Sequence, residues 1–455
     1  MNIINPATEE IIKTVQEDSP AALHEKYTVL RQAQKAWGLK SLSERLAVVQ
    51  RFYDLLAEEI ENLAAVLTAE VGKPLTQSRN EINGARTRIL WMLDNAARYL
   101  SEELITDTEA MQEKISYEPL GVICNISAWN YPYLVGVNVF VPALMAGNSV
   151  MYKPSEYATL TGLEIEQLWK KAGLPSGVFE VAIGAKETGE ALLELDFDGY
   201  FFTGSYRTGN YIYEKVAHKM VPCQLELGGK DPLYVADDVI DVAAVAAGTA
   251  DGAFYNNGQS CCAVERIYVH EAIYDPYEAA FLKEVQSWKT GLPTEEGVYI
   301  AALTRKEQLT VLEDQVKDAL SKGATLLYGG KRSAGKGYYF EPTVLVNVTN
   351  EMKVMREESF GPIIGIMKVK DDEEALIFMK DTAYGLTAAV YSQDMDRAQR
   401  ILSDIDAGSG YWNCCDRVSA GLPWSGRKHS GFGATLSHQG FRAFVKPKAW
   451  HLRKA

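Results

Sequence analysis

Short runs of β-forming residues alternate with helical segments along most of this 455-residue chain. Five such runs lie between residues 121 and 227, and they read GVICNIS, NSVMYKP, VFEVAIG, YFFTG and CQLEL. Most of them are separated by segments whose apolar residues recur at helical spacing. Strands that alternate with helices are typical of a parallel sheet wrapped by helices. The alternation therefore predicts an α/β fold.

The alternation resumes after residue 228, which predicts a second α/β unit with a boundary near ELGGKDP at 226–232. Strands are expected at DPLYVA, ERIYVH, ATLLYGG and GPIIGIMKV, and helices near 241–253, 274–289 and 305–322. At the N-terminal end, helical spacing runs over 20–70 until Gly72 and Pro74, and a helix over 77–101 follows. The final stretch, FRAFVKPKAWHLRKA, alternates like an exposed edge strand that a second subunit would cover.

The charge balance narrows the classes of partner. The chain has 46 Lys and Arg against 60 Asp and Glu, a net charge of −14, so its surface repels nucleic acid and anionic membranes. We find no apolar run of about 18 residues that would predict a membrane span. The opening residues, MNIINPATEE, lack the basic start and apolar core of a secretory signal. We therefore expect a cytoplasmic protein.

The cysteines favour reduced thiols over disulfides. Adjacent cysteines bridge only with strain, and four of the six here stand in two adjacent pairs. The chain has no C-x-x-C or H-x-x-x-H spacing and its six histidines are scattered, so we predict no metal site. The cysteines are Cys124, Cys223, Cys261, Cys262, Cys414 and Cys415.

Two segments could bind a nucleotide. In YFFTGSYRTGN, residues 200–210, a strand, a glycine turn and a helix N-terminus would offer free N–H groups to phosphate. Its G-x-x-x-x-G spacing differs from the dinucleotide fingerprint, so a plain strand-to-helix turn is the alternative. In VMYKPSEYA, Lys153 and Glu156 follow a strand, where open α/β sheets bind ligands. They suit ribose hydroxyls, unless they are ordinary solvated loop charges.

Three further residue types suggest acyl chemistry. Glu226 interrupts an apolar strand, and burial would raise its pKa and suit it to general-base work, unless it turns to solvent. Within AFYNNGQSCCAVERIYVH, either Cys261 or Cys262 could attack an electrophilic carbon as a thiolate, the alternative being a small buried apolar residue. The amide of Asn130, in SAWNYPY, could donate to an oxyanion.

Taken together, eight stretches resemble the aldehyde dehydrogenase superfamily, in its order and over the whole chain. They are NPATEE, AWNYPY, MYKPSE, FFTGSYRTG, ELGGKDP, NNGQSCCAVER, EESFGPI and LPWSGRKHSGFG. The resemblance implies two doubly wound parallel-sheet domains and a small β oligomerisation element that pairs subunits into a homodimer or homotetramer. The Rossmann-like, dinucleotide-binding domain would comprise 1–102 and 120–228, the catalytic domain 229–427, and the oligomerisation element 103–119 and 428–455.

The resemblance also implies roles for individual residues. Cys261, from GQSC, matches the nucleophile, and Cys262 is then a packing neighbour. Glu226 matches the general base, and Asn130 the oxyanion donor beside the backbone N–H of Cys261. The residues that match the cofactor site are Lys153 and Glu156 (adenosine ribose), Thr203, Gly204 and Ser205 (pyrophosphate turn), Trp129 (the same channel), and Glu358 and Phe360 (nicotinamide ribose and ring). Because a carboxylate at Glu156 repels a 2′-phosphate, NAD is expected over NADP.

The implied reaction oxidises an aldehyde to the carboxylic acid through a thiohemiacetal and a thioester. The substrate tunnel would be formed by Tyr131, Asn138, Tyr255, Val418 and Trp424, whose aromatic rings suggest a medium or aromatic aldehyde. Asn138 stands where relatives often have a large aromatic residue or an arginine, and Ala128 where many have proline. Arg417 would meet an anionic substrate or lie on the surface.

Four alternatives remain open. The first two are a semialdehyde or an amino-aldehyde enzyme of the same superfamily. The third is a CoA-acylating or phosphorylating enzyme, in which a thiol or phosphate takes the thioester; such members commonly lack the glutamate found at 226. The fourth is a thiol hydrolase or binding protein on the same fold, which would leave Lys153, Glu358 and Phe360 without a shared purpose.

Overall fold

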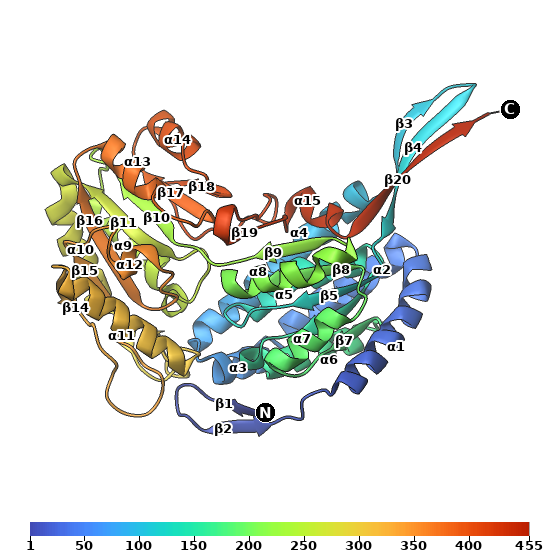
Figure 1. The fold of residues 1–455 in the computed structure, drawn as a ribbon, viewed down its shortest axis with the longest axis horizontal. Helices are drawn as coiled ribbons and strands as arrows, with labels where there is room; N and C mark the ends of the chain where they lie inside the picture. Colours follow the sequence, from blue (N-terminus) through green and yellow to red (C-terminus); the bar gives the residue numbers. More distant parts are fainter. Residues whose placement is uncertain (455) are drawn as a thin grey trace.

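Two open sheets form the centres of two α/β units in the computed structural model, which describes residues 1–454 (Figure 1). The first sheet has six strands in the order β19-β9-β8-β5-β6-β7, all parallel except β19. All five strands expected between residues 121 and 227 are present in it. The strands are β5 (Val122–Ile126), β6 (Ser149–Lys153), β7 (Phe179–Val181), β8 (Gly199–Thr203), β9 (Cys223–Glu226) and β19 (Gly431–Phe432).

Eight helices accompany this sheet. They are α1 (Pro20–Leu39), α2 (Leu42–Glu58), α3 (Ile60–Val71), α4 (Leu75–Leu100), α5 (Pro132–Met145), α6 (Thr159–Lys171), α7 (Lys186–Glu194) and α8 (Tyr206–Val216). The helical run predicted over 20–70 is divided into three helices because capping residues start and end helices within it. Ser41 and Glu44 form a capping box that starts α2, and Gly72, in a left-handed conformation, ends α3.

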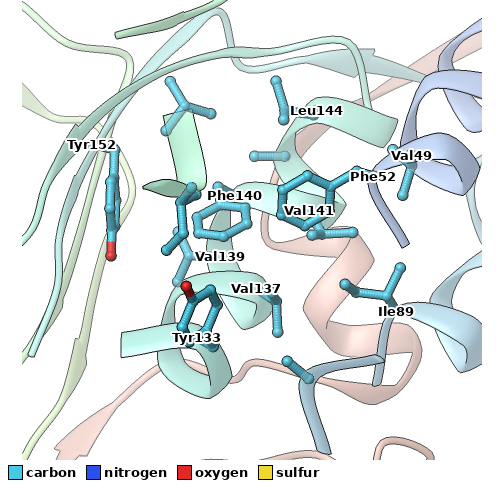
Figure 2. Packing of buried hydrophobic residues seen from close by; sticks show 14 of the residues in the cluster. Val49, Phe52, Ile89, Tyr133, Val137, Val139, Phe140, Val141, Leu144 and Tyr152 are labelled. Atoms are coloured by element: carbon cyan, nitrogen blue, oxygen red, sulfur yellow. The ribbon is translucent and has the colours of Figure 1, made fainter. Parts of the chain in front are cut away.

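The core of the first unit centres on α5 (Figure 2). Ten of the fourteen α5 residues are hydrophobic and twelve are buried, so this helix lies inside the unit and not on its surface. Phe140 packs edge-on against Phe52, Tyr152 and Phe179, while Phe52 and Trp169 stack with ring centroids 3.8 Å apart. This packing holds the start of α5, which follows Asn130, in a rigid frame.

The second sheet has seven strands in the order β14-β15-β16-β11-β10-β17-β18, all parallel except β14. The sequence pattern predicts β10 (Asp231–Val235), β11 (Val264–His270), β14 (Thr325–Tyr328) and β16 (Ile363–Val369). It misses β15 (Thr343–Val346), β17 (Thr387–Tyr391) and β18 (Ser409–Trp412). Length alone does not explain this, because the pattern predicts β7, β9 and β14, which have only three or four residues. The missed strands are positioned by pairing with distant parts of the sequence.

Six helices belong to this unit, three of them predicted within two residues of their ends. They are α9 (Val242–Phe254), α10 (Tyr274–Ser287), α11 (Lys306–Ser321), α12 (Lys353–Arg356), α13 (Asp372–Lys380) and α14 (Met395–Ser403). Two small pairs also occur, β1 (Asn2–Ile4) with β2 (Ile11–Thr14), and β12 (Lys289–Thr290) with β13 (Val298–Ile300).

A three-stranded antiparallel sheet projects from the first unit as an arm (Figure 1). It contains β3 (Glu103–Asp107), β4 (Met111–Pro119) and β20 (Val445–Arg453), and the expected C-terminal strand is therefore present. Between residues 428 and 444, β19 pairs with β9 and α15 (Ser437–Arg442) packs against α4, so this segment lies on the first unit. The fold class is α/β with two parallel-sheet units and a small β element, as predicted. No helix within residues 1–454 is long and apolar enough to cross a membrane.

Candidate active site

The carboxyl ends of four parallel strands define the site. Strand order reverses between β5 and β8 in the first sheet, and ligands of doubly wound sheets bind at such a switch point. Asn130 follows β5, Lys153 ends β6, Thr203 ends β8 and Glu226 ends β9. These four residues, which span almost a hundred positions in the sequence, therefore lie at the same edge of the sheet.

The loop before Cys261 is fixed by two asparagines in left-handed backbone conformations, Asn256 (φ 55°) and Asn257 (φ 56°). Asparagine tolerates this region better than most residues because its side chain bonds locally. Asn256 Nδ2 donates to the carbonyls of Asn130 (3.2 Å) and Gln259 (3.1 Å), and Asn257 Nδ2 donates to the carbonyl of Ala302 (3.0 Å). Both asparagines are fully buried, so the approach to Cys261 is rigid.

Asn130 is held from both sides. Its Nδ2 donates to the Gln259 carbonyl at 3.1 Å, which occupies one of its two amide hydrogens. Its own carbonyl accepts from Lys73 Nζ at 2.8 Å, and Lys73 forms an ion pair with Glu81 in which both side chains are fully buried. Glu81 Oε1 also accepts from the backbone N–H of Tyr133 at 2.8 Å. Burial raises the pKa of Glu81 and lowers that of Lys73, while their mutual attraction opposes both shifts.

Glu226 and Cys261 are linked through the two glycines after β9. A Cβ atom placed on Gly229 would lie 2.5 Å from the carbonyl oxygen of Cys261, so the chain leaving β9 runs directly against the cysteine. Desolvation of Glu226 raises its pKa well above the ordinary value, and the Trp424 side chain partly offsets this as a hydrogen-bond donor. The Glu226 backbone carbonyl accepts from the N–H of Gly204 at 2.9 Å, which joins the end of β9 to the predicted pyrophosphate turn.

The two cysteines differ sharply in their surroundings. Cys262 is buried, and its thiol donates to Asp416 Oδ1 at 2.9 Å. A hydrogen bond with Cys261, burial and the Asp416 carboxylate together raise the pKa of Cys262 well above the ordinary thiol value. Cys261 is only half-buried. Since the thiolate is the nucleophile, the environment disfavours Cys262 in that role.

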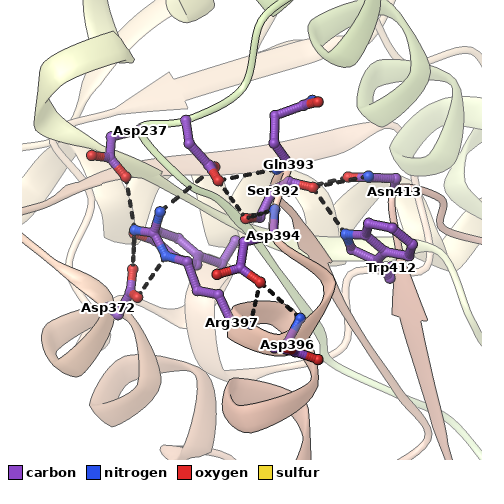
Figure 3. Close-up of polar contacts among 11 residues, drawn as sticks. Asp237, Asp372, Ser392, Gln393, Asp394, Asp396, Arg397, Trp412 and Asn413 are labelled. Atoms are coloured by element: carbon purple, nitrogen blue, oxygen red, sulfur yellow. Dashed lines mark hydrogen bonds and ion pairs between the residues drawn. The ribbon is translucent and has the colours of Figure 1, made fainter.

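The segment that carries Asp416 is anchored to the second sheet (Figure 3). The indole N–H of Trp412 and the amide of Asn413 both donate to the carbonyl of Ser392 at 2.9 Å. Arg397 is the centre of a neighbouring charge cluster that includes Asp237 and Asp372. Burial raises the pKa of Asp416 to about 7, and the Cys262 hydrogen bond opposes the rise. Sequence reasoning did not single out Asp416.

Glu358 and Phe360 lie beside the same glycines. The N–H of Gly229 donates to Glu358 Oε1 at 3.0 Å, and a Cβ atom on Gly228 would collide with that carboxylate. Burial and the nearby Glu265 carboxylate raise the pKa of Glu358 to about 8. The Phe360 ring meets the Trp129 ring edge-on at 5.3 Å.

A buried ion pair that the sequence did not suggest holds this segment. Lys230 Nζ lies 2.5 Å from Glu265 Oε2 and 3.0 Å from Ser359 Oγ. Glu265 in turn accepts from the backbone N–H groups of Ser359 and Phe360 at 3.0–3.1 Å. The spacing of GGK and VER gave no signal for this pairing, because the two residues meet only when β11 is placed beside β10.

The remaining predicted cofactor residues surround the ends of β6 and β8. Lys153 is buried, and among residues 1–454 its Nζ donates only to the Pro154 carbonyl, at 3.3 Å. Burial lowers the pKa of Lys153. Glu156 accepts from Ser155 Oγ at 3.0 Å, and Ser205 caps α8 by accepting from the Thr208 N–H at 3.4 Å. A Cβ atom on Gly204 would collide with the Phe202 ring, so glycine is required between Thr203 and Ser205.

The predicted tunnel residues come from four parts of the chain. Tyr131 lies under Lys73 Nζ, 3.9 Å from the ring centroid, and the Tyr255 hydroxyl accepts from Asn80 Nδ2 at 3.1 Å. Val418, Trp424 and Cys261 all pack against the core of the first unit. Arg417 is exposed and lines a cavity of about 760 Å³ together with Tyr255 and Asp416.

Asn138 has a partner that the sequence did not suggest. Its Oδ1 accepts from Arg88 Nη1 at 3.0 Å, which brings an arginine from α4 to this part of the site.

A scan against protein-family models matches residues 1–450 to the aldehyde dehydrogenase family. The chain belongs to this family. Among its relatives, a succinate-semialdehyde dehydrogenase [NADP(+)] from Deinococcus radiodurans is 33% identical over 98% of this chain and 93% of its own length. The peroxisomal aminoaldehyde dehydrogenase 1 of Pisum sativum is 34% identical over 98% and 91%.

Solved structures agree with the family assignment. A crystal structure of a betaine aldehyde dehydrogenase variant from Staphylococcus aureus, in complex with NAD+, superposes with a TM-score of 0.94. It is 30% identical over 99% of this chain and 94% of its own. The protein is therefore an NAD(P)-dependent aldehyde dehydrogenase, as the resemblance implied.

Proposed function

We propose that the enzyme oxidises its aldehyde to the carboxylic acid through a covalent thioester on Cys261, with NAD as the hydride acceptor. The single observation that carries this proposal is the contact of the Cys261 loop with both partners. Asn130 donates to the Gln259 carbonyl, two residues before Cys261, and Gly229, three residues after Glu226, touches the Cys261 carbonyl.

Each residue then has a distinct task. Cys261, as thiolate, attacks the aldehyde carbon, and the amide hydrogen of Asn130 that Gln259 does not use donates to the oxyanion, together with the Cys261 N–H. One such donor is typically worth about 3–4 kcal/mol of barrier. After the hydride has left, Glu226 takes a proton from the water that hydrolyses the thioester. The raised pKa of Glu226 suits a base that operates near neutral pH.

The residues around β6, β8 and β9 fit a dinucleotide. A buried ammonium at Lys153 with a single carbonyl partner has donors left for ribose hydroxyls, and Gly204 and Gly228 leave room where a Cβ atom would collide. NAD would supply the hydride acceptor. Glu156 and Lys153 would hold the adenosine ribose, and Glu358 and Phe360 the nicotinamide end. The Glu156 carboxylate supports NAD over NADP, since it would repel a 2′-phosphate.

Glu226 also supports hydrolysis over acyl transfer to CoA. A CoA-acylating enzyme needs no base for water, whereas this chain keeps a carboxylate at the end of β9 with its pKa raised.

The tunnel side chains Tyr131, Tyr255 and Trp424 support an aldehyde of medium length or one with an aromatic group. The names of the relatives, which include semialdehyde and aminoaldehyde dehydrogenases, support a substrate with a polar second end.

We further propose the division of the chain that the resemblance implied. Residues 1–102 and 120–228 would bind the dinucleotide, and 229–427 would supply the nucleophile. The arm of β3, β4 and β20 would pair subunits, with exposed Leu104, Ile105 and Leu452 as its apolar contacts. The six unpaired cysteines support a reducing, cytoplasmic setting.

The test replaces each of the two cysteines by alanine in turn. Cys261→Ala should abolish NAD reduction with any aldehyde, because no thioester can form. Cys262→Ala should keep most of the activity, since its thiol only packs beside Asp416. The opposite pattern would show that Cys262 is the nucleophile. A burst of one thioester per subunit, trapped by acid and located by mass spectrometry on Cys261, would be a direct confirmation.

A further inference from the structure

Arg88 is an arginine inside the site without a carboxylate partner. It is half-buried on α4, and its Nη1 donates to the carbonyl of Leu134 (3.1 Å) and to Asn138 Oδ1 (3.0 Å). These two bonds occupy both Nη1 hydrogens. Among the described residues, 1–454, Nε and Nη2 have no hydrogen-bond acceptor, and no acidic side chain lies within 4.0 Å of the guanidinium. Three donors are thus left free.

The guanidinium contacts the first two turns of α5. The ionisable groups that act on Arg88 electrostatically are Cys262, Cys261, Glu81 and Asp416, in that order. Burial lowers the Arg88 pKa to about 10, so the side chain still carries its charge at neutral pH. Its contacts to Leu134 and Asn138 are both on α5, the helix that begins immediately after Asn130 and Tyr131. Arg88 therefore contacts Asn138, a predicted tunnel residue, on the helix that follows Asn130.

The nearby carboxylates are engaged elsewhere. Glu81 pairs with Lys73, and Asp416 accepts the Cys262 thiol. Of the other arginines of α4, Arg79 pairs with Glu61 and Arg86 lies over the Tyr53 ring. Arg98 is exposed and lies over the Tyr99 ring. A partly buried charge without a counter-ion is costly, and a guanidinium presents its donors in the planar arrangement that matches a carboxylate or sulfonate.

We propose that Arg88, oriented by Asn138, binds an anionic group at the far end of the substrate, so that the enzyme acts on aldehydes that also carry a carboxylate or a sulfonate. The proposal rests on the proposed function, because the aldehyde end is taken to be at Cys261. It changes the interpretation of Asn138, which by itself offers no positive charge. Asn138 is instead the acceptor that aims an arginine from the neighbouring helix.

The experiment compares one anionic and one neutral aldehyde of equal length. NAD-coupled kcat/KM would be measured for 4-oxobutanoate and for butanal with wild type, Arg88→Met and the control Arg98→Met, which removes an exposed charge from the same helix. Arg88→Met should lower kcat/KM for 4-oxobutanoate about 100-fold, equivalent to about 2.7 kcal/mol at about 1.36 kcal/mol per tenfold. The loss should appear mainly in KM. Butanal turnover should change less than about threefold, and the control should leave both unchanged.

Two further measurements separate binding from a structural or electrostatic role. Asn138→Ala should lower the ratio of the two kcat/KM values less than Arg88→Met does, and the double variant should lose no more than Arg88→Met alone. Arg88→Lys keeps a charge and should retain part of the ratio if Arg88→Met fails to fold. A third aldehyde, 3-sulfopropanal, tests whether the sulfonate or the carboxylate is preferred.

Several results would overturn the proposal. An equal loss for 4-oxobutanoate and butanal in Arg88→Met, with a shifted pH dependence of iodoacetamide alkylation at Cys261, would show that Arg88 serves the thiolate. An unchanged ratio, or a wild-type preference for butanal or benzaldehyde over both anions, would also exclude it. Failure of the proposed function looks different, because wild type would then oxidise none of these aldehydes with NAD or would do so without Cys261.

Discussion

The buried ion pair between Lys73 and Glu81 allows a test of how Asn130, the proposed oxyanion donor, is held. Both side chains are 0% exposed, Glu81 also binds the Tyr133 N–H, and Lys73 also binds the Asn130 carbonyl. In Glu81→Gln the ammonium of Lys73 would stay buried with neutral partners only, namely the Asn130 carbonyl, the Tyr131 ring and the new amide. Breaking a buried pair from one side typically costs about 3–5 kcal/mol, because the remaining charge is uncompensated.

An exposed pair that also involves α4 is the control. Arg79 and Glu61 join α4 to α3 at 2.7 Å, with exposed fractions of 37% and 68%. Glu61→Gln should cost about 0–1 kcal/mol because water screens such pairs. The free energy of unfolding would be measured by urea titration with tryptophan fluorescence, at one protein concentration for all variants. Glu81→Gln should be less stable than Glu61→Gln by at least about 2 kcal/mol.

The same variant reports on the site. Because Lys73 anchors the Asn130 backbone, Glu81→Gln should reduce kcat more than it changes KM. Replacement of both partners by apolar residues, Lys73→Met with Glu81→Leu, should recover stability relative to Glu81→Gln but not kcat. Equal stability of the Glu81→Gln and Glu61→Gln variants would refute the reasoning. So would a double variant that is no more stable than Glu81→Gln.

Two further predictions concern Glu226 and Glu156. A carboxyl with a raised pKa stays protonated to higher pH, so thioester hydrolysis should accelerate as pH rises through the raised pKa of Glu226. Glu226→Gln should abolish that rise and slow turnover about 10²–10⁴-fold, while stopped-flow still detects one rapid equivalent of NADH per active site. Glu156→Ser should raise kcat/KM with NADP relative to NAD, measured as initial rates at matched substrate, because it removes the charge expected near the 2′-hydroxyl; an unchanged ratio would mean that Glu156 does not meet the ribose.

Much of the first unit could be predicted because its strands and its site obey local rules. The runs that contain Cys124, Lys153 and Glu226 are bounded by turn residues, and each ends where a parallel strand delivers its side chains to the ligand edge. The second sheet was predicted less completely. β15, β17 and β18 are short, and their positions depend on pairing with strands far away in the sequence.

The charged groups that support the site could not be predicted in this way. Lys230 and Glu265 are 35 residues apart and meet through neighbouring strands, and Cys262 meets Asp416 across 154 residues. In the sequence, Lys230, Glu265 and Asp416 resemble ordinary surface charges. Cys262 resembles an ordinary core thiol. Only the pairing reveals that Glu265 binds the N–H groups of Ser359 and Phe360, and that Cys262 is held as a neutral thiol.

Glu81 and Arg88 show that the role of a charged residue on a helix depends on its ion-pair partner. The residue type alone does not reveal that role. They are seven residues apart on α4, two turns along one face, and both turn toward α5. Lys73 neutralises Glu81 and thereby makes it structural, whereas no carboxylate among residues 1–454 lies within ion-pair distance of Arg88. Of these two charges, the half-buried arginine is therefore the one that we propose binds the substrate.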